Sequence, residues 1–125
     1  DAIRFALERQ SKYIVLVPCC QAEVAAHMRQ NKNTAIKESS LSEIWRHPIH
    51  TREFGSHITN VLRCLQLEAH GYQVTVTELV GWEHSMKNEL IVARKVAKFK
   101  KSARERQLSI MKELGLEGMT ERFAY

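Results

Sequence analysis

The sequence has few cysteines, few glycines and no long apolar run. These shortages argue against a disulfide framework, a glycine-rich nucleotide-binding turn and a membrane span. Three cysteines, two of them adjacent, do not make a disulfide framework, so we expect a reduced, cytoplasmic protein. The longest apolar run, from Tyr13 to Cys20, is strand-sized and falls short of the ~18 residues of a membrane span. The five glycines are dispersed and form no G-x-G-x-x-G turn.

The composition is that of a globular domain with a basic excess. The chain has 125 residues, of which 44% are hydrophobic and 26% charged, and this suits one packed domain. Its 19 Lys and Arg against 14 Asp and Glu give a net charge of +5, and the excess is concentrated after Arg94. The first residues already follow a helical pattern without a signal-peptide layout, so we expect a piece of a longer protein.

Periodicity predicts alternating helices and strands. Apolar spacing indicates helices over 1–10, 51–70 and 98–114, and β-prone residues indicate strands over 13–17, 72–80 and 89–96. The first strand is apolar on both faces, which is typical of burial between two helical layers. The helical connection to the second strand favours a parallel β-α-β unit, and the short connection between the last two favours an antiparallel hairpin.

Three local motifs carry a resemblance to a known family. Asp1-Ala2-Ile3 precedes the first strand, Pro18-Cys19-Cys20 ends it, and Lys87-Asn88 opens the last strand. Together they resemble the C-terminal half of class I S-adenosylmethionine-dependent methyltransferases, in a subgroup with a Cys-Cys motif after strand five. That subgroup includes tRNA 2′-O-methyltransferases and methyltransferase-domain proteins.

The resemblance implies a fold class and a division of the chain. It implies an α/β fold: the C-terminal half of a Rossmann-like methyltransferase sheet, with helices on both faces. Parallel strands would end in an antiparallel hairpin, whose last strand is the inserted seventh strand of the family. Residues 1–97 would belong to the methyltransferase domain, and 98–125 would form a basic helical tail.

The resemblance also implies an enzyme with a cofactor and partners. Methyl transfer would run from S-adenosylmethionine to RNA such as tRNA or rRNA. The family's Gly-rich turn and its acidic ribose-binding residue have no counterpart here. We therefore expect a missing N-terminal half of the same chain to hold the cofactor; the oligomeric state is left open.

The strand-end motif supplies the first candidate site residues. In an open α/β sheet, ligands bind at the carboxyl ends of strands, which makes Pro18 a candidate cofactor contact and Cys19 and Cys20 candidate catalytic residues in the pocket wall. Alternatively, two small thiols fill a tight corner. A thiolate nucleophile is disfavoured because the nearest candidate base, His27, lies past a helical turn from the cysteines. A redox pair is disfavoured because no C-x-x-C occurs. No metal site is expected, since the histidines lack ligand spacing.

Two further segments are candidate substrate contacts. In the loop between the last two strands, Trp82 suits base stacking, Lys87 suits a phosphate, and Glu83 lies between them. In the basic run after Arg94, the candidate RNA contacts are Lys98, Lys101 and Arg104, although such a run also suits a solvated helix face. The alternative function is a non-catalytic RNA-binding or scaffold module.

Overall fold

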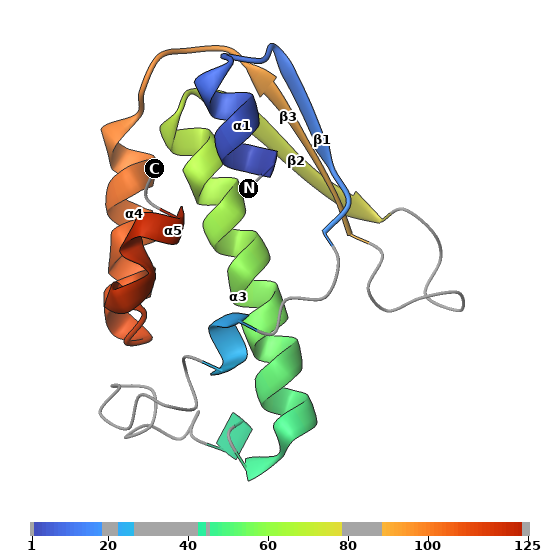
Figure 1. The fold of residues 1–125 in the computed structure, drawn as a ribbon, viewed down its shortest axis with the longest axis vertical. Coiled ribbons are helices and arrows are strands. Elements are labelled where there is room, and N and C mark those ends of the chain that lie inside the picture. The colour runs from blue at the N-terminus through green and yellow to red at the C-terminus, as the bar shows by residue number, and fades with distance from the viewer. Residues whose placement is uncertain (1, 19–22, 27–42, 45, 79–88, 124–125) are drawn as a thin grey trace.

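A computed structural model describes residues 2–18, 23–26, 43–44, 46–78 and 89–123. Its longest helix runs beside a small sheet, and the C-terminal helices pack along the side of that helix away from the strands (Figure 1). None of the helices in this described part is long and apolar enough to span a membrane. The elements in chain order are α1 (Ala2–Glu8), β1 (Tyr13–Leu16), α3 (Pro48–Ala69), β2 (Tyr72–Glu78), β3 (Glu89–Lys95), α4 (Lys101–Glu113), η3 (Glu117–Met119) and α5 (Thr120–Phe123).

Helix α3 has clear sequence signals at both ends. It begins at Pro48, whose fixed φ and missing N–H suit the first helical position. It ends at Ala69, and Gly71 follows with a φ of +88°, a conformation that glycine adopts without steric cost. The predicted helix over 51–70 is therefore confirmed, with a start three residues earlier than the apolar pattern indicates.

The sheet has three strands in the order β1-β3-β2, and β3 pairs antiparallel with both neighbours. In one ladder Leu16 lies opposite Ile91, and in the other Glu78 lies opposite Glu89. Because β1 and β2 are both antiparallel to β3, they run in the same direction as each other. The predicted antiparallel pairing of the last two strands is confirmed.

The predicted fold class, a Rossmann-like methyltransferase sheet with parallel strands, is wrong. Every strand pair among the described residues is antiparallel. A helical connection between two strands allows them to run in the same direction, but it does not make them neighbours in the sheet. Here β3 occupies the space between β1 and β2, so the parallel ladder does not form.

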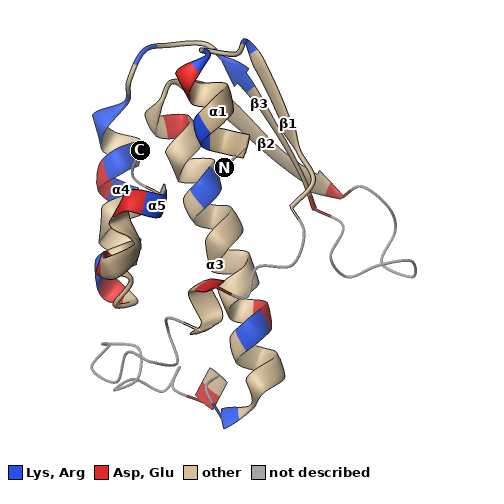
Figure 2. Ribbon diagram, viewed as in Figure 1, with Lys and Arg blue, Asp and Glu red and all other residues tan. Residues whose placement is uncertain are grey.

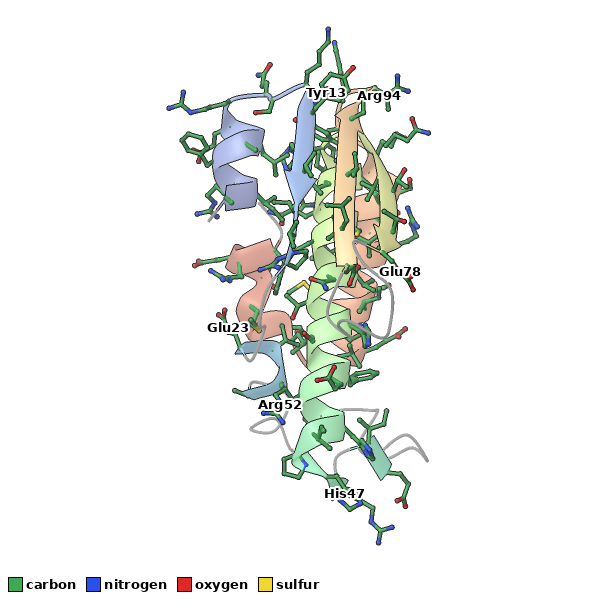
Figure 3. All side chains as sticks on the ribbon, turned by 90° about the vertical axis from the view of Figure 1, so that its right-hand side faces the viewer. Tyr13, Glu23, His47, Arg52, Glu78 and Arg94 are labelled. Carbon is green, nitrogen blue, oxygen red and sulfur yellow. The ribbon has the colours of Figure 1, made fainter. Side chains whose placement is uncertain are left out.

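The prediction of helices on both faces of the sheet is also wrong for the described elements. Side chains on one face, such as Ile14 and Ile91, are buried against α1 and α3. On the other face Tyr13 is 64% exposed and Val15 is 62% exposed. Figure 3 shows this face, with the strands in front of α3. An apolar run alone does not distinguish a strand between two layers from an edge strand with one apolar face left open.

Two apolar clusters hold the elements together. The first joins α1, the sheet and the second half of α3, and its buried members are Ile3, Leu7, Ile14, Leu67, Tyr72, Ile91 and Ala93. The second joins α3 to the C-terminal helices, and its buried members are Val24, Leu62, Met111, Leu114, Leu116, Met119 and Phe123. The C-terminal segment after residue 97 therefore packs on α3 and shares an apolar core with that helix.

Candidate functional site

The carboxyl end of β1 lies beside the first residues of β3 and the last residues of β2. Leu16 pairs with Ile91, and two residues later the half-buried Pro18 leaves the sheet. Glu78, the last residue of β2, pairs with Glu89, the first residue of β3. We call this end of the sheet, marked by Pro18, Glu78 and Glu89, the Pro18 end.

Most of the predicted site residues at this end lie outside the described residues. These are Cys19 and Cys20 after β1, and Trp82, Glu83 and Lys87 between β2 and β3. The structure does describe where their segments start and finish. Pro18 precedes the Cys-Cys pair, and Glu78 and Glu89 flank the segment 79–88, so both segments leave the sheet at the same end.

A polar pair on the helix-facing side of the Pro18 end was not found from the sequence. Asn60 of α3 donates a hydrogen bond from Nδ2 to Oε2 of Glu89 at 2.7 Å. Asn60 is only 8% exposed, and its Oδ1 is buried without a hydrogen-bond partner. Glu89 lies two positions before the buried Ile91 along β3 and therefore on the same face of the strand, which turns its carboxylate toward α3. No sequence signal marks Asn60, because a single polar residue in a helix is usually solvated.

Cys64 lies one helical turn after Asn60 and is half-buried. Burial in the protein, with smaller contributions from the carboxylates of Glu89 and Glu68, raises the pKa of its thiol from 9.0 to about 11. The thiol is therefore protonated at neutral pH, and Cys64 does not qualify as a nucleophile.

Iodoacetamide is expected to alkylate Cys64 slowly at pH 8, because only the thiolate reacts. With a pKa of about 11 in place of 9.0, the thiolate fraction and the rate fall ~100-fold. Mass spectrometry of the peptide that contains Cys64 measures the rate. Unfolding in urea should restore it, and Glu89→Gln should raise it less than urea does because burial is the larger cause. Equal rates in the folded and unfolded protein would contradict the assignment.

The predicted RNA contacts of the basic run lie at the other end of the sheet. β3 carries the chain from Glu89 to Lys95, where the Lys95 N–H donates to the carbonyl of Lys12 at 2.8 Å. Seven strand residues span about 20 Å. Lys98 and Lys101 follow the far end of β3 and are exposed. The structure thus separates them from the Pro18 end by the length of the strand.

Arg104 is less exposed than Lys98 and Lys101, the other predicted RNA contacts of the basic run. Its Nη2 lies 3.5 Å from Nε2 of His70, and its Cζ lies 5.7 Å from the centre of the Phe99 ring. Burial lowers the pKa of the guanidinium. Arg104 therefore serves packing at the junction of α3 and α4 as well as contributing positive charge.

Figure 2 shows Lys and Arg along the α1–β1 turn, the end of β3 and the connection to α4. Acidic residues offset part of this charge: Arg106 pairs with Glu68 at 2.9 Å, and Lys101 lies 3.9 Å from Glu105. The second pair is long and exposed, and such pairs contribute little to stability. The exposed Phe99 lies within this basic segment and was missed at the sequence level, although the motif Lys98-Phe99-Lys100-Lys101 is a readable signal.

Metal ligation and comparisons with known proteins add no further assignment. Among the described residues, no group of three or more His, Cys, Asp or Glu side chains could hold a metal ion. His47 and His50 instead contact each other edge to face, with ring centres 5.3 Å apart. No protein-family model matches the chain, and neither a curated protein nor a solved structure matches it.

Proposed function

We propose that this chain is the C-terminal part of an S-adenosylmethionine-dependent methyltransferase that acts on RNA such as tRNA or rRNA. The observation that carries the proposal is the position of β3, an antiparallel strand inserted between two strands of common direction. The resemblance of the Pro18-Cys19-Cys20 and Lys87-Asn88 motifs implies an inserted last strand of this kind. The parallel ladder that the sequence predicted is no part of the proposal.

The described residues do not fit the cofactor by themselves. Among the described residues, the glycines with positive φ are Gly71 and Gly115, and they follow the ends of α3 and α4 and not the carboxyl end of β1. The polar groups described at the Pro18 end are the amide of Asn60 and the carboxylates of Glu78 and Glu89. We therefore assign S-adenosylmethionine to a complementing N-terminal half.

On this proposal, the chain's own contribution is substrate positioning. Methyl transfer depends mainly on holding the acceptor atom in line with the methyl group, which needs little covalent chemistry from the protein. Pro18 would border the cofactor, with Cys19 and Cys20 as the wall of the reaction pocket. Trp82, Glu83 and Lys87 would contact the RNA near the acceptor, whereas the basic run would bind phosphates farther away.

The basic charge supports RNA as the proposed partner, and the free thiol supports the cytoplasm as the proposed compartment. RNA is the proposed partner because exposed lysines such as Lys98 and Lys100 gather at one end of the sheet. We propose the cytoplasm as the compartment, since Cys64 is a free thiol and the cytoplasm keeps thiols reduced.

The test is transfer of a tritiated methyl group from S-adenosylmethionine to total cellular RNA by the full-length protein. We expect label in RNA that disappears after ribonuclease digestion, and reduced label in the double variant Cys19→Leu/Cys20→Leu, whose larger side chains would narrow the pocket. Titration calorimetry of the same protein should show cofactor binding. Absence of cofactor binding would overturn the enzymatic proposal.

The second candidate function is a non-catalytic RNA-binding module. It is favoured by one observation: the basic residues lie a strand length from the Pro18 end, where the proposed chemistry would occur. RNA binding with no affinity for S-adenosylmethionine would support this candidate against the methyltransferase.

A further inference from the structure

Phe99 is an exposed aromatic ring surrounded by lysines at the end of the sheet opposite Pro18. The ring is 58% exposed, and Lys98, Lys100 and Lys101 on either side of it are exposed as well. We call Lys98, Phe99, Lys100 and Lys101 the Phe99 patch. Phe5 is exposed to a similar degree, at 57%, so it is the lysines on both sides of Phe99, and not exposure alone, that mark this ring.

The backbone on both sides of Phe99 is fixed by hydrogen bonds. The N–H groups of Val96 and Ala97 donate to the carbonyl of Gly71, at 2.9 and 3.0 Å. On the other side, the N–H of Lys100 donates to the carbonyl of Ala69 at 2.7 Å. The patch is therefore attached to the C-terminal end of α3 immediately before and after the aromatic ring.

Two side chains, of His70 and Arg104, lie against the ring. His70 contacts it edge to face, with ring centres 6.0 Å apart and planes at 87°. The Arg104 guanidinium lies 5.7 Å from the ring centre. With these contacts in place Phe99 remains 58% exposed as a residue, and its ring has an orientation that the protein sets beforehand.

We propose that the Phe99 patch binds single-stranded RNA, with a base stacked on Phe99 and phosphates beside the lysines. Base stacking on an aromatic ring combined with lysine–phosphate contacts is the chemistry by which proteins hold single strands. Two carboxylates of this region, Glu68 and Glu105, are paired with Arg106 and Lys101, which limits their repulsion of phosphates.

The inference rests on the proposed RNA substrate and specifies that this RNA is longer than a single nucleotide. The patch lies about 20 Å from the Pro18 end, by the length of β3. A single nucleotide does not reach from one to the other, so the substrate is a polynucleotide with an unpaired segment. The patch positions this segment and takes no part in the chemistry.

Fluorescence anisotropy with a labelled single-stranded 12-nucleotide RNA tests the proposal on the full-length protein without cofactor. Phe99→Ala should weaken binding ~10-fold, the usual effect of losing one stacked base. The matched control is Ile49→Ala: Ile49 is 55% exposed but lies in the first turn of α3, ~30 Å along the helix from Ala69. The control should bind as the wild type does.

Three further measurements make the outcome decisive. Replacing Lys98, Lys100 and Lys101 with Ala should reduce the salt slope of log Kd by roughly 2, at ~0.7 per phosphate contact. Phe99→Trp should keep the affinity, and its fluorescence should be quenched by the RNA relative to wild type, which also shows that the site is folded. A duplex of the same sequence should bind more weakly than the single strand, because its bases are not free to stack.

Equal binding by wild type, Phe99→Ala and Ile49→Ala would overturn the proposal. So would tighter binding to vesicles of phosphatidylcholine and phosphatidylserine than to RNA, with the same dependence on Phe99. Because this assay omits S-adenosylmethionine, Phe99-dependent RNA binding without methyl transfer would reject the enzymatic function and keep the patch.

Discussion

Replacing Gly71 with alanine is expected to destabilise the protein by more than about 3 kcal/mol. Gly71 has a φ of +88°, which L side chains rarely adopt. An added Cβ would lie 2.1 Å from the carbonyl oxygen of Ala97 and 2.4 Å from that of Lys98. Both atoms belong to the backbone, so no side-chain rotation relieves the overlap.

The overlap would also open the junction between α3 and the Phe99 patch. The Gly71 carbonyl accepts the hydrogen bonds from Val96 and Ala97, so the segment that Cβ would displace is the one this residue holds. We therefore expect RNA binding by Gly71→Ala to fall even at temperatures where the rest of the protein stays folded. Anisotropy below the unfolding transition measures this second effect.

Urea unfolding of the variant and of a matched control separates overlap from backbone strain. Gly115 also has a positive φ, +68°, so Gly115→Ala carries the conformational cost of about 1–2 kcal/mol. Gly71→Ala should be the more destabilised of the two. If both variants lost the same stability, the contact with the 97–98 backbone would not be the reason for glycine at position 71.

The elements of this fold are readable from the sequence because each has a local cause. Pro48 and Gly71 bracket α3, and the alternation from Tyr72 onward indicates β2. The pairing of β1 with β3, in contrast to that of β2 with β3, has no local cause. The sequence shows that α3 connects two strands, yet the choice of β3 as the neighbour of both depends on packing among segments far apart in the chain.

The candidate site likewise has parts that the sequence predicts and parts that depend on the fold. The Pro18-Cys19-Cys20 motif and the residues around Trp82 could be named from the sequence, and the register then gives their segments a common end of the sheet. The pairing of Asn60 with Glu89 could not be predicted, because it joins α3 to β3 across 29 positions. Phe99 was readable as an aromatic among lysines, but its exposure is a property of the fold.

In helix α4 the apolar stripe of the sequence predicts the buried face correctly at two of its three positions and wrongly at the third. Its apolar residues Leu108, Met111 and Leu114 suggest the packed face. In the structure Leu108 is 40% exposed, whereas its polar neighbour Gln107 is fully buried. Gln107 shares its face with Met111, one turn later, and lies against α3. Hydrophobicity ranks the two neighbours in the wrong order because it ignores the hydrogen bonds that Gln107 makes.

Gln107→Ala is expected to cost about 2–4 kcal/mol, more than Leu108→Ala, which should cost less than about 1 kcal/mol. The Gln107 Nε2 donates to the carbonyls of Leu62 at 3.1 Å and of Phe123 at 2.8 Å, joining α3 and α5 through α4. Truncation leaves a cavity and removes one hydrogen bond from each of the two carbonyls. Removing the unpartnered Oε1 offsets part of this loss.

Urea unfolding of the two alanine variants, followed by circular dichroism, measures this difference. Gln107→Met keeps most of the side-chain volume but not the donor, so its remaining deficit relative to wild type reports the two hydrogen bonds without the cavity. The expected order of stability is wild type, Leu108→Ala, Gln107→Met, Gln107→Ala. If Leu108→Ala proved the less stable alanine variant, Leu108 and not Gln107 would dock α4 on α3. Lys101 of the Phe99 patch, the first residue of that helix, would then face a different direction.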